Sequence, residues 1–307
     1  MSSLLAAYHE LPVRGGLADL SDRVKLLLTG ADRVRYLNGQ VTSNVPKLAA
    51  GQTQPACVTT AKGRLCAEVL ITALDDALCI DAEAALRVTL PARLERYIIA
   101  DDVTLEDVTE TRALLHFIGP PPSAFDSARC IRARRFGRDG WDVQLPTADF
   151  AVMKAALFSQ HLLLDEALLE TLRIEAGLPR WGRDIGEDTL PPEAGLDRTH
   201  IDYHKGCYIG QEVISRLKSV GHVNRHLTGF VAADGPPPAV GASIFAPGEE
   251  RAVGTITSAA FSFALEKPVA LGYLKRGSPT SGLVARPADA TGPEARIAVH
   301  PLPFVPS

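Results

Sequence analysis

The change of sequence pattern near Gly221 constrains the fold of this chain more than any other feature. Beyond it, short alternating segments are separated by glycine and proline turns such as Gly235-Pro236-Pro237-Pro238. Such spacing without helical patterns predicts a small β-barrel or sandwich. The expected strands are residues 226–232, 242–245, 252–257, 269–274 and 282–285. The proline-rich end, 301–307, is expected to lie extended over the surface.

Strand-like and helical patterns alternate before Gly221. A first set comprises strands at 24–28, 56–60, 65–72, 77–81 and 103–108 and helices at 31–40 and 83–99. Pro91 predicts a break or kink in the second of these helices. A second set comprises strands at 112–118, 130–136 and 141–145 and helices at 148–163 and 166–176. The repeated order predicts an α+β fold of two packed layers ahead of the barrel, with units at 1–110, 111–221 and 222–307.

Composition narrows the function classes. The chain has 307 residues, of which 46% are hydrophobic, so it can bury a substantial core. No apolar run approaches ~20 residues, and the first residues lack the basic and apolar regions of a signal peptide. We therefore expect no membrane partner and a cytoplasmic protein, or one of the mitochondrial matrix if the source is eukaryotic. A net charge of -4 argues against direct nucleic-acid binding.

A local run of arginines is the exception to this charge balance. Alternation in a strand would place Arg132 and Arg134 on one face and Arg135 on the other. A solvated sheet face is the expected reading, ahead of a phosphate or RNA contact.

The five cysteines indicate a reduced protein. They are odd in number and include no close pair, which predicts neither a disulfide framework nor a CxxC metal site. Cys57, Cys66, Cys79 and Cys130 lie in apolar runs and are expected to fill the core.

Cys207 differs because it precedes a predicted helix at 210–219. An apolar stripe of Val213, Leu217 and Val220 indicates this helix, and Gly221 would end it. Unpaired helix N–H groups and the neighbouring Lys205 should lower the pKa of the Cys207 thiol. The alternative is a buried, inert cysteine.

The segment KGCYIGQE, Lys205 to Glu212, closely resembles the signature of YgfZ-type folate-binding proteins. These are relatives of the aminomethyltransferase, or T-protein, of the glycine cleavage system. RIEAGLPRWGRDI, PPEAGLD, GADRVRYLNGQVTSNV and VGTITSAAFSFALEKPVALGYLKR resemble other parts of that superfamily. The resemblance implies tetrahydrofolate, or a one-carbon derivative of it, as the cofactor.

Glu175 is the second candidate site residue. It shares a helical face with Leu168 and Leu172 and lies near the helix end, where the helix dipole disfavours negative charge. A carboxylate in this position needs a partner. Arg173, Arg180 or Arg183 could supply an ion pair, whereas the resemblance implies that the matching glutamate holds the pterin ring of tetrahydrofolate.

Other candidates surround these two residues. We expect Tyr208, Gln211, Arg216 and Asn44 to contact the folate, and Lys205 to act with Cys207. Arg216 and Arg225 could meet the folate glutamate tail, although the residues by themselves favour surface cations for both. On the local pattern alone, Gln40, Thr42 and Asn44 fit a capping or turn role better than a pocket. His200, His204 and Cys207 have metal-ligand spacing on a helix, but Gly206 weakens that helix and we predict no metal site.

One departure from the resemblance bears on activity. The segment KGRLCAEV carries Cys66 and Ala67 where the glycine-cleavage enzyme has its catalytic aspartate. Glu68 is close, but one residue further along a strand turns its side chain to the other face. We therefore do not expect an efficient aminomethyltransferase.

The leading functional hypothesis follows the resemblance. It is a tetrahydrofolate-binding protein that supports iron–sulfur cluster assembly or repair, with client enzymes or assembly factors as partners. The folate would lie between the α+β layers, with Glu175 on its ring and Cys207 at the mouth. The alternatives are a folate-dependent aminomethyltransferase and a non-catalytic interaction scaffold.

Overall fold

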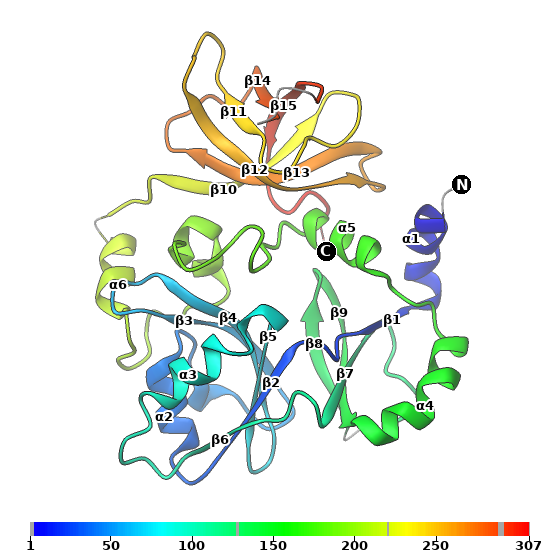
Figure 1. Ribbon diagram of the computed structural model, residues 1–307, viewed down its shortest axis with the longest axis vertical. Coiled ribbons are helices and arrows are strands. Elements are labelled where there is room, and N and C mark those ends of the chain that lie inside the picture. Colours follow the sequence, from blue (N-terminus) through cyan, green and yellow to red (C-terminus); the bar gives the residue numbers. More distant parts are fainter. Residues whose placement is uncertain (1–2, 127–128, 220, 288–291, 307) are drawn as a thin grey trace.

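The computed structural model describes residues 3–126, 129–219, 221–287 and 292–306. Two sheets lie beside each other, and a barrel lies above them across a layer of helices and irregular segments (Figure 1). This arrangement confirms the predicted α+β fold followed by a small β-barrel. None of the described helices is long and apolar enough to cross a membrane.

The first sheet has the strand order β3-β4-β5-β2-β6. Its strands are β2 (Val24–Thr29), β3 (Thr53–Thr59), β4 (Leu65–Ala73), β5 (Leu78–Ala82) and β6 (Thr104–Asp107). Helices α2 (Arg33–Gln40) and α3 (Thr89–Glu95) cover one face, where Leu37 and Leu94 are fully buried. Alternation in β4 sends Val69 and Ile71 to this helix-covered core. The opposite face carries polar side chains, among them Glu68 and Asp81, beside the buried Cys57.

The prediction of one long helix at 83–99 is wrong. The segment forms a short 3-10 helix, η2 (Ala84–Leu86), followed by α3. Pro91 lies in the first turn of α3, where its missing N–H costs nothing, so the break precedes the proline rather than coinciding with it.

The second sheet has the order β1-β7-β9-β8. Its strands are β1 (Gly16–Asp19), β7 (Arg112–Ile118), β8 (Cys130–Arg135) and β9 (Arg138–Pro146). Helix α4 (Thr147–Gln160) packs on one face, and α1 (Ser3–Arg14) and α5 (Glu166–Glu175) pack on the other. Because β1 pairs with β7, the start of the chain belongs to this sheet rather than to the first one.

Helix α1 was not among the sequence predictions. Leu4, Ala7, Tyr8 and Leu11 follow the i, i+3, i+4, i+7 spacing of a helix, and all of them pack against the second sheet's core. The signal was therefore present in the printed sequence.

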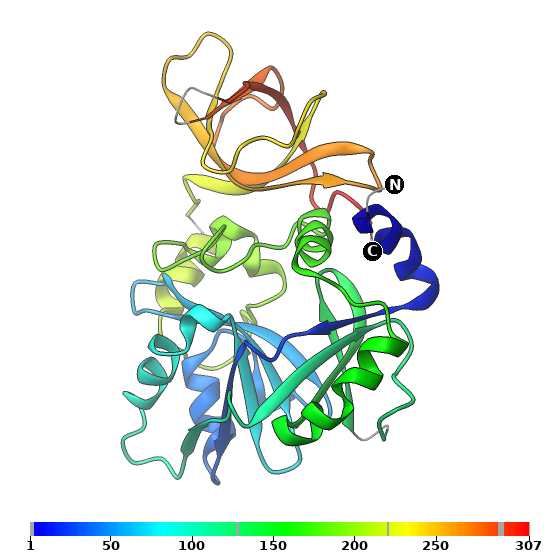
Figure 2. The same cartoon turned by 45° about the vertical axis from the view of Figure 1, so that its right-hand side comes forward.

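The barrel closes in the order β10-β13-β12-β11-β14-β15. Its strands are β10 (Arg225–Ala232), β11 (Ser243–Phe245), β12 (Ala252–Ser262), β13 (Lys267–Lys275), β14 (Leu283–Arg286) and β15 (Ala295–His300). Strand β15 was not predicted. The C-terminal tail, red in Figure 2, returns from the barrel to α5, where the Phe304 N–H donates to the Glu175 carbonyl at 2.8 Å.

Candidate functional site

The KGCYIGQE segment forms a loop followed by a helix. We call residues 201–210 the motif loop; α6 (Gln211–Ser219) follows it, close to the predicted 210–219. Ile214 is the buried residue of α6, while Val213 and Leu217 are half-buried. Val220, the third member of the predicted stripe, lies outside the described residues. The predicted helix is confirmed, with its inward face centred one residue away from the expected stripe.

Lys205 anchors the motif loop to the end of α2. Its ammonium donates to the backbone carbonyls of Asn38, Val41 and Ser43 at 2.6–2.7 Å. Carbonyls at a helix C-terminus are otherwise unpaired and carry partial negative charge, so a buried cation fits there. Burial lowers the pKa of Lys205 to about 8. Its donors are directed to these carbonyls, and no hydrogen bond joins it to Cys207 among the described residues.

Ile209 and Gly210 anchor the other end of the loop. The Thr59 hydroxyl donates to the Ile209 carbonyl, and the Ile209 N–H donates to Gly39. Gly210 has φ +91°, and a Cβ there would lie 2.5 Å from the Thr60 carbonyl oxygen. Only glycine permits this close approach to the β3–β4 turn.

Cys207 lies at the tip between these anchors. Both Cys207 and Gly206 are exposed, whereas the adjacent Tyr208 is 7% exposed. The hydroxyl of Tyr208 is buried and has no hydrogen-bond partner. The loop thus presents one thiol on a firmly held backbone. Activation of that thiol by α6 stays a prediction.

A β-bulge in β4 decides which side chains face inward. Val58 pairs with Ala67 and Thr59 with Leu65, so Cys66 is an extra residue in the strand. Ala67 belongs to the helix-covered core, and Cys66 packs against the same core. Glu68 faces the opposite side, toward His200.

The bulge lies before Ala67 and leaves Ala67 and Glu68 on opposite faces of the strand. Glu68 does lie on the other face from Ala67, as expected, but its face is the polar one. A carboxylate at position 67 would be buried among apolar side chains. The chain therefore keeps a carboxylate, Glu68, on the inner side of the sheet, and the doubt about aminomethyl transfer stays a prediction.

Glu68 and His200 form a pair inside the molecule. Nε2 of His200 lies 3.2 Å from Oε1 of Glu68, and Nδ1 lies 2.7 Å from the Thr199 hydroxyl. Burial alone would raise the pKa of Glu68, but the hydrogen bond and charge of His200, helped by Arg23, lower it. The Glu68 side chain nevertheless keeps 27% of its surface exposed. An inward-facing side chain with that exposure borders open space.

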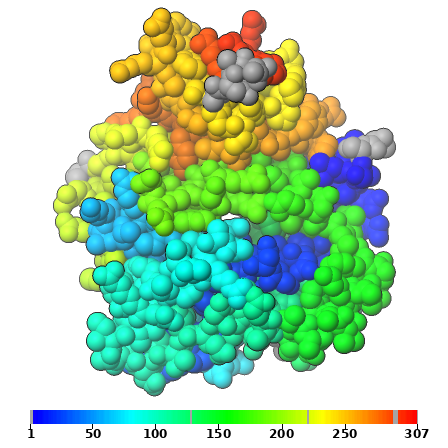
Figure 3. Space-filling model, in the orientation of Figure 1, coloured from blue at the N-terminus to red at the C-terminus, as the bar shows by residue number. Residues whose placement is uncertain are grey.

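Ion pairs surround the centre of the molecule. Arg23 contacts Asp81 at 2.6 Å and Glu83 at 2.7 Å, and Arg180 reaches Glu83 at 3.6 Å. Arg135 binds both Asp81 and Asp142 between the two sheets. Figure 3 shows a hollow where the dark blue, cyan and green parts of the chain meet, the same three parts that these pairs join. The centre is thus polar and charged.

The arginine run behaves as predicted on one face only. Arg132 stacks on Trp141 and Arg134 pairs with the exposed Asp139, which fits a solvated face. Arg135, on the other face, is not solvated but bridges the two sheets.

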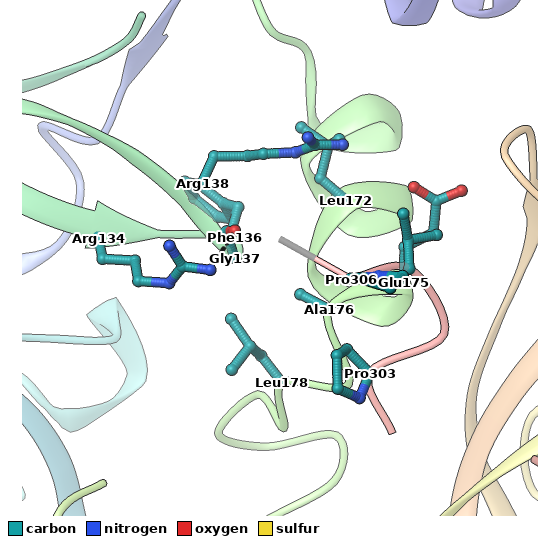
Figure 4. Close-up of a pocket in the computed structure, with 11 residues that line it drawn as sticks. Arg134, Phe136, Gly137, Arg138, Leu172, Glu175, Ala176, Leu178, Pro303 and Pro306 are labelled. Carbon is teal, nitrogen blue, oxygen red and sulfur yellow. Dashed lines mark hydrogen bonds between the residues drawn. The ribbon is translucent and has the colours of Figure 1, made fainter. Parts of the chain in front are cut away.

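Glu175 is not open to a ligand. Glu175 is only 2% exposed. Its carboxylate oxygens accept hydrogen bonds from the Tyr8 hydroxyl at 2.8 Å and from the Ser262 hydroxyl at 2.6 Å. A small cavity of about 90 Å³ lies beside it, but the carboxylate points away from that space toward the barrel (Figure 4). The expected need for a partner is real, but hydroxyls of α1 and β12 meet it, not a nearby arginine.

Glu175 and Cys207 are also far apart in the fold. Glu175 is tied to α1, while Cys207 precedes α6, and these helices lie on opposite sides of the molecule in Figures 1 and 2. The expectation that both residues face one hollow is therefore not met.

A cleft of about 700 Å³ lies between the barrel and the segment 182–189. Arg225, Tyr273 and Lys275 contribute to its barrel side, and Asp184 and Thr189 to the other. Arg225 covers the Tyr273 ring at 4.5 Å. The Tyr273 hydroxyl is buried beside Thr189. The cleft has the size of a small-molecule site.

Glu193 was missed by the sequence analysis. It lies in η4 (Pro191–Ala194), and its Oε2 accepts from Arg225 at 3.1 Å. An acidic residue after two prolines is typical of the first turn of a helix. The sequence pattern therefore gave no indication that Glu193 contacts Arg225 beside the cleft.

The remaining candidates have structural partners. Asn44 donates to Asp202 at 3.1 Å, and the Thr42 hydroxyl donates to the His200 carbonyl, so the turn reading fits both. Arg216 pairs with Glu212 on the exposed side of α6, which Gln211 begins. His204 is exposed while His200 points inward, and no metal-ligand group occurs among the described residues.

Two sheets side by side, a closed barrel above them and a cleft beside the barrel define an α+β protein with a C-terminal β-barrel. Residues 6–128 match the GCVT N-terminal domain, and residues 225–305 match the glycine cleavage T-protein C-terminal barrel domain. The chain belongs to the glycine cleavage T-protein superfamily.

Individual relatives agree with this placement. The chain is 27% identical over 288 residues to the aminomethyltransferase of Picosynechococcus sp., covering 84% of this chain and 78% of that protein. It is 27% identical to the mitochondrial aminomethyltransferase of Pisum sativum, covering 95% and 79%. The crystal structure of glycine cleavage system aminomethyltransferase T from Bartonella henselae has the same fold, with a TM-score of 0.85 at 22% identity over 98% and 89% of the two chains.

Proposed function

We propose that this protein binds a tetrahydrofolate-type cofactor in its polar centre, with Glu68 as the carboxylate that faces the ligand. The observation that carries the proposal is the inward position of Glu68, which keeps 27% of its side chain exposed beside His200. An ionised carboxylate accepts N–H bonds from a reduced pterin strongly. The folate dependence of aminomethyltransferases supports the choice of cofactor.

The barrel cleft would take the glutamate tail of the same ligand. Arg225 and Lys275 bring positive charge to it. A carboxylate tail would pair with both cations. This assignment keeps Arg225 as a tail residue and leaves Arg216 as a surface cation.

The second half of the proposal concerns Cys207. Its exposed position at the tip of an anchored loop suits contact with another protein rather than with a buried ligand. With the likeness of KGCYIGQE to the YgfZ signature, this supports a role in the assembly or repair of iron–sulfur clusters in client proteins. The folate and the thiol would then act at separate places on the molecule.

A folate-dependent aminomethyltransferase is the second candidate. The inward Glu68 and the similarity to named aminomethyltransferases favour it. Formation of methylenetetrahydrofolate from a lipoyl-bound aminomethyl substrate by the purified protein would establish this candidate. Folate binding without such turnover, together with loss of iron–sulfur enzyme activity in a deletion strain, would favour the first.

Calorimetry with tetrahydrofolate tests the shared part of both candidates. Wild-type protein should bind, and Glu68→Gln should bind at least about tenfold more weakly because it removes one charge-assisted hydrogen bond. Glu106→Gln, at an exposed position on β6 of the same sheet, is the matched control and should bind as wild type. Absence of binding by the wild type would leave only the scaffold hypothesis.

A further inference from the structure

The surroundings of Glu68 contain a residue that the proposed function does not use. His200 is 8% exposed and lies immediately before the motif loop. Its Nε2 contacts Oε1 of Glu68 at 3.2 Å, whereas no described residue donates to Oε2. One carboxylate oxygen is thus held by the protein and the other is free.

The backbone of His200 is fixed independently of this contact. Its carbonyl accepts from the Thr42 hydroxyl at 2.6 Å, and that hydroxyl accepts from the Cys57 N–H at 2.9 Å. The Asp202 N–H donates to the Thr42 carbonyl at 3.0 Å. Both bonds join the chain at and just after His200 to Thr42, which Cys57 of β3 holds in turn, so the backbone that carries the imidazole is fixed.

We propose that His200 is the positioning residue for the ligand-facing carboxylate: it holds Oε1 of Glu68 in the ionised form so that Oε2 meets the N–H groups of a reduced pterin. The proposal rests on the proposed function for its ligand, but the contact itself exists without one. The Thr199 hydroxyl, 2.7 Å from Nδ1, fixes the ring orientation.

Other charged and titratable groups also face the pair. Arg23, from the turn before β2, favours the ionised carboxylate, and Asp81 of β5 opposes it. Asp81 is itself paired with Arg23 and Arg135, which limits its effect. Cys57 of β3 also lies within electrostatic range of Glu68, and burial raises the pKa of its thiol, so it stays neutral. His200 is consequently the neighbour that bonds Glu68 directly.

The sign of the expected pH effect follows from these contacts. Because His200 contributes to lowering the pKa of Glu68, its removal should raise that pKa. Ligand binding that needs the carboxylate would then be lost at a higher pH when the solution is acidified. A merely structural histidine would change stability without moving this pH dependence.

The first measurement uses ligand-free protein and carbon-13 NMR of the glutamate carboxyls, with Glu68→Gln to assign the Glu68 signal. In His200→Ala and His200→Gln the Glu68 titration should move upward by about one pH unit or more, the effect of removing a nearby opposite charge. His204→Gln is the matched control, because His204 lies in the same segment but is exposed, and it should leave the titration in place. An unchanged titration in both His200 variants overturns the proposal, whether or not folate binds.

The second measurement is the pH dependence of tetrahydrofolate affinity. The acid-side loss of binding should shift upward with His200→Ala, and affinity near neutral pH should fall several-fold. His200→Gln should recover part of the neutral-pH affinity, since an amide N–H can still hold Oε1, but not the wild-type pH profile. Binding with a wild-type profile in both variants would overturn the role of His200 and leave the folate proposal standing.

Discussion

The Tyr8 hydroxyl donates to Oε2 of Glu175 across a separation of 167 residues, at 2.8 Å. The other oxygen of the same carboxylate accepts from Ser262 at 2.6 Å. One buried side chain therefore joins the first helix, the end of α5 and the barrel. Burial and the hydrogen bond to Glu175 raise the pKa of Tyr8, so the hydroxyl remains a donor at any working pH.

Glu175→Ala should accordingly affect stability and not folate binding. It leaves one half-buried and one fully buried hydroxyl without their acceptor, at a cost of about 2–4 kcal/mol in the free energy of unfolding. Urea unfolding measures this loss. Glu10→Ala, which removes an exposed pair with Arg14 on α1, should change stability by less than about 0.5 kcal/mol. A large loss of folate affinity with unchanged stability would restore Glu175 as a ligand residue.

The partners of Glu175 illustrate what could and could not be predicted from the sequence. Its misfit was readable from local rules, since an acid near a helix C-terminus on an apolar face needs a partner. The identity of that partner was not readable, because Tyr8 and Ser262 are brought to it only by the folded chain. The local sequence pattern therefore predicts that the Glu175 carboxylate has a partner, whereas only the tertiary structure shows which residues are its partners.

Strands and helices were predictable where periodicity was regular. Strand β7 has the predicted bounds, and α6 begins one residue later than expected. The bulge at Cys66 was not predicted, because an extra residue has no marker in this sequence, but Glu68 lies on the other face from Ala67, as expected. The motif loop was recognised as important, but Lys205 proved to bond backbone carbonyls rather than the thiol.

Lys205 should make stability depend on pH in an unusual window. Its pKa is lowered to about 8, below the ordinary value of about 10.4, so between these values the unfolded chain binds a proton that the folded chain does not. Stability from this residue should therefore rise as the pH increases through that window, by up to about 3 kcal/mol.

The comparison of wild type with Lys205→Met isolates this effect. At neutral pH the variant should already be less stable by about 2–4 kcal/mol, since three carbonyls lose their donor. The difference should widen when unfolding is repeated between pH 8 and 10. A difference that stays constant or narrows would mean that Lys205 remains charged throughout.

Two glycines of the motif should respond differently to the same substitution. Gly210→Ala forces a Cβ to 2.5 Å from the Thr60 carbonyl oxygen at φ +91°, and should cost at least about 2 kcal/mol. Gly206→Ala meets nothing within 4 Å and should cost about 1 kcal/mol or less. Thermal unfolding of the two variants compares them directly. Equal losses would show that the docking of the loop on the β3–β4 turn does not limit its stability.

The cysteines should differ in their rate of alkylation. Cys207 is exposed, whereas Cys57, Cys79 and Cys130 are buried and Cys66 is half-buried. Burial also raises the pKa of the Cys79 thiol, to about 11, so few thiolates form there at neutral pH. Iodoacetamide should therefore modify Cys207 first and by a wide margin, as measured by peptide mass spectrometry.

The variant Gly210→Ala, which loosens the loop, tests what sets this rate. If exposure alone sets it, the rate of alkylation at Cys207 should be nearly unchanged. A marked fall in that rate would mean that the held backbone before α6 activates the thiol, as the sequence predicts. Modification of a buried cysteine ahead of Cys207 would contradict the placement of the motif loop at the surface.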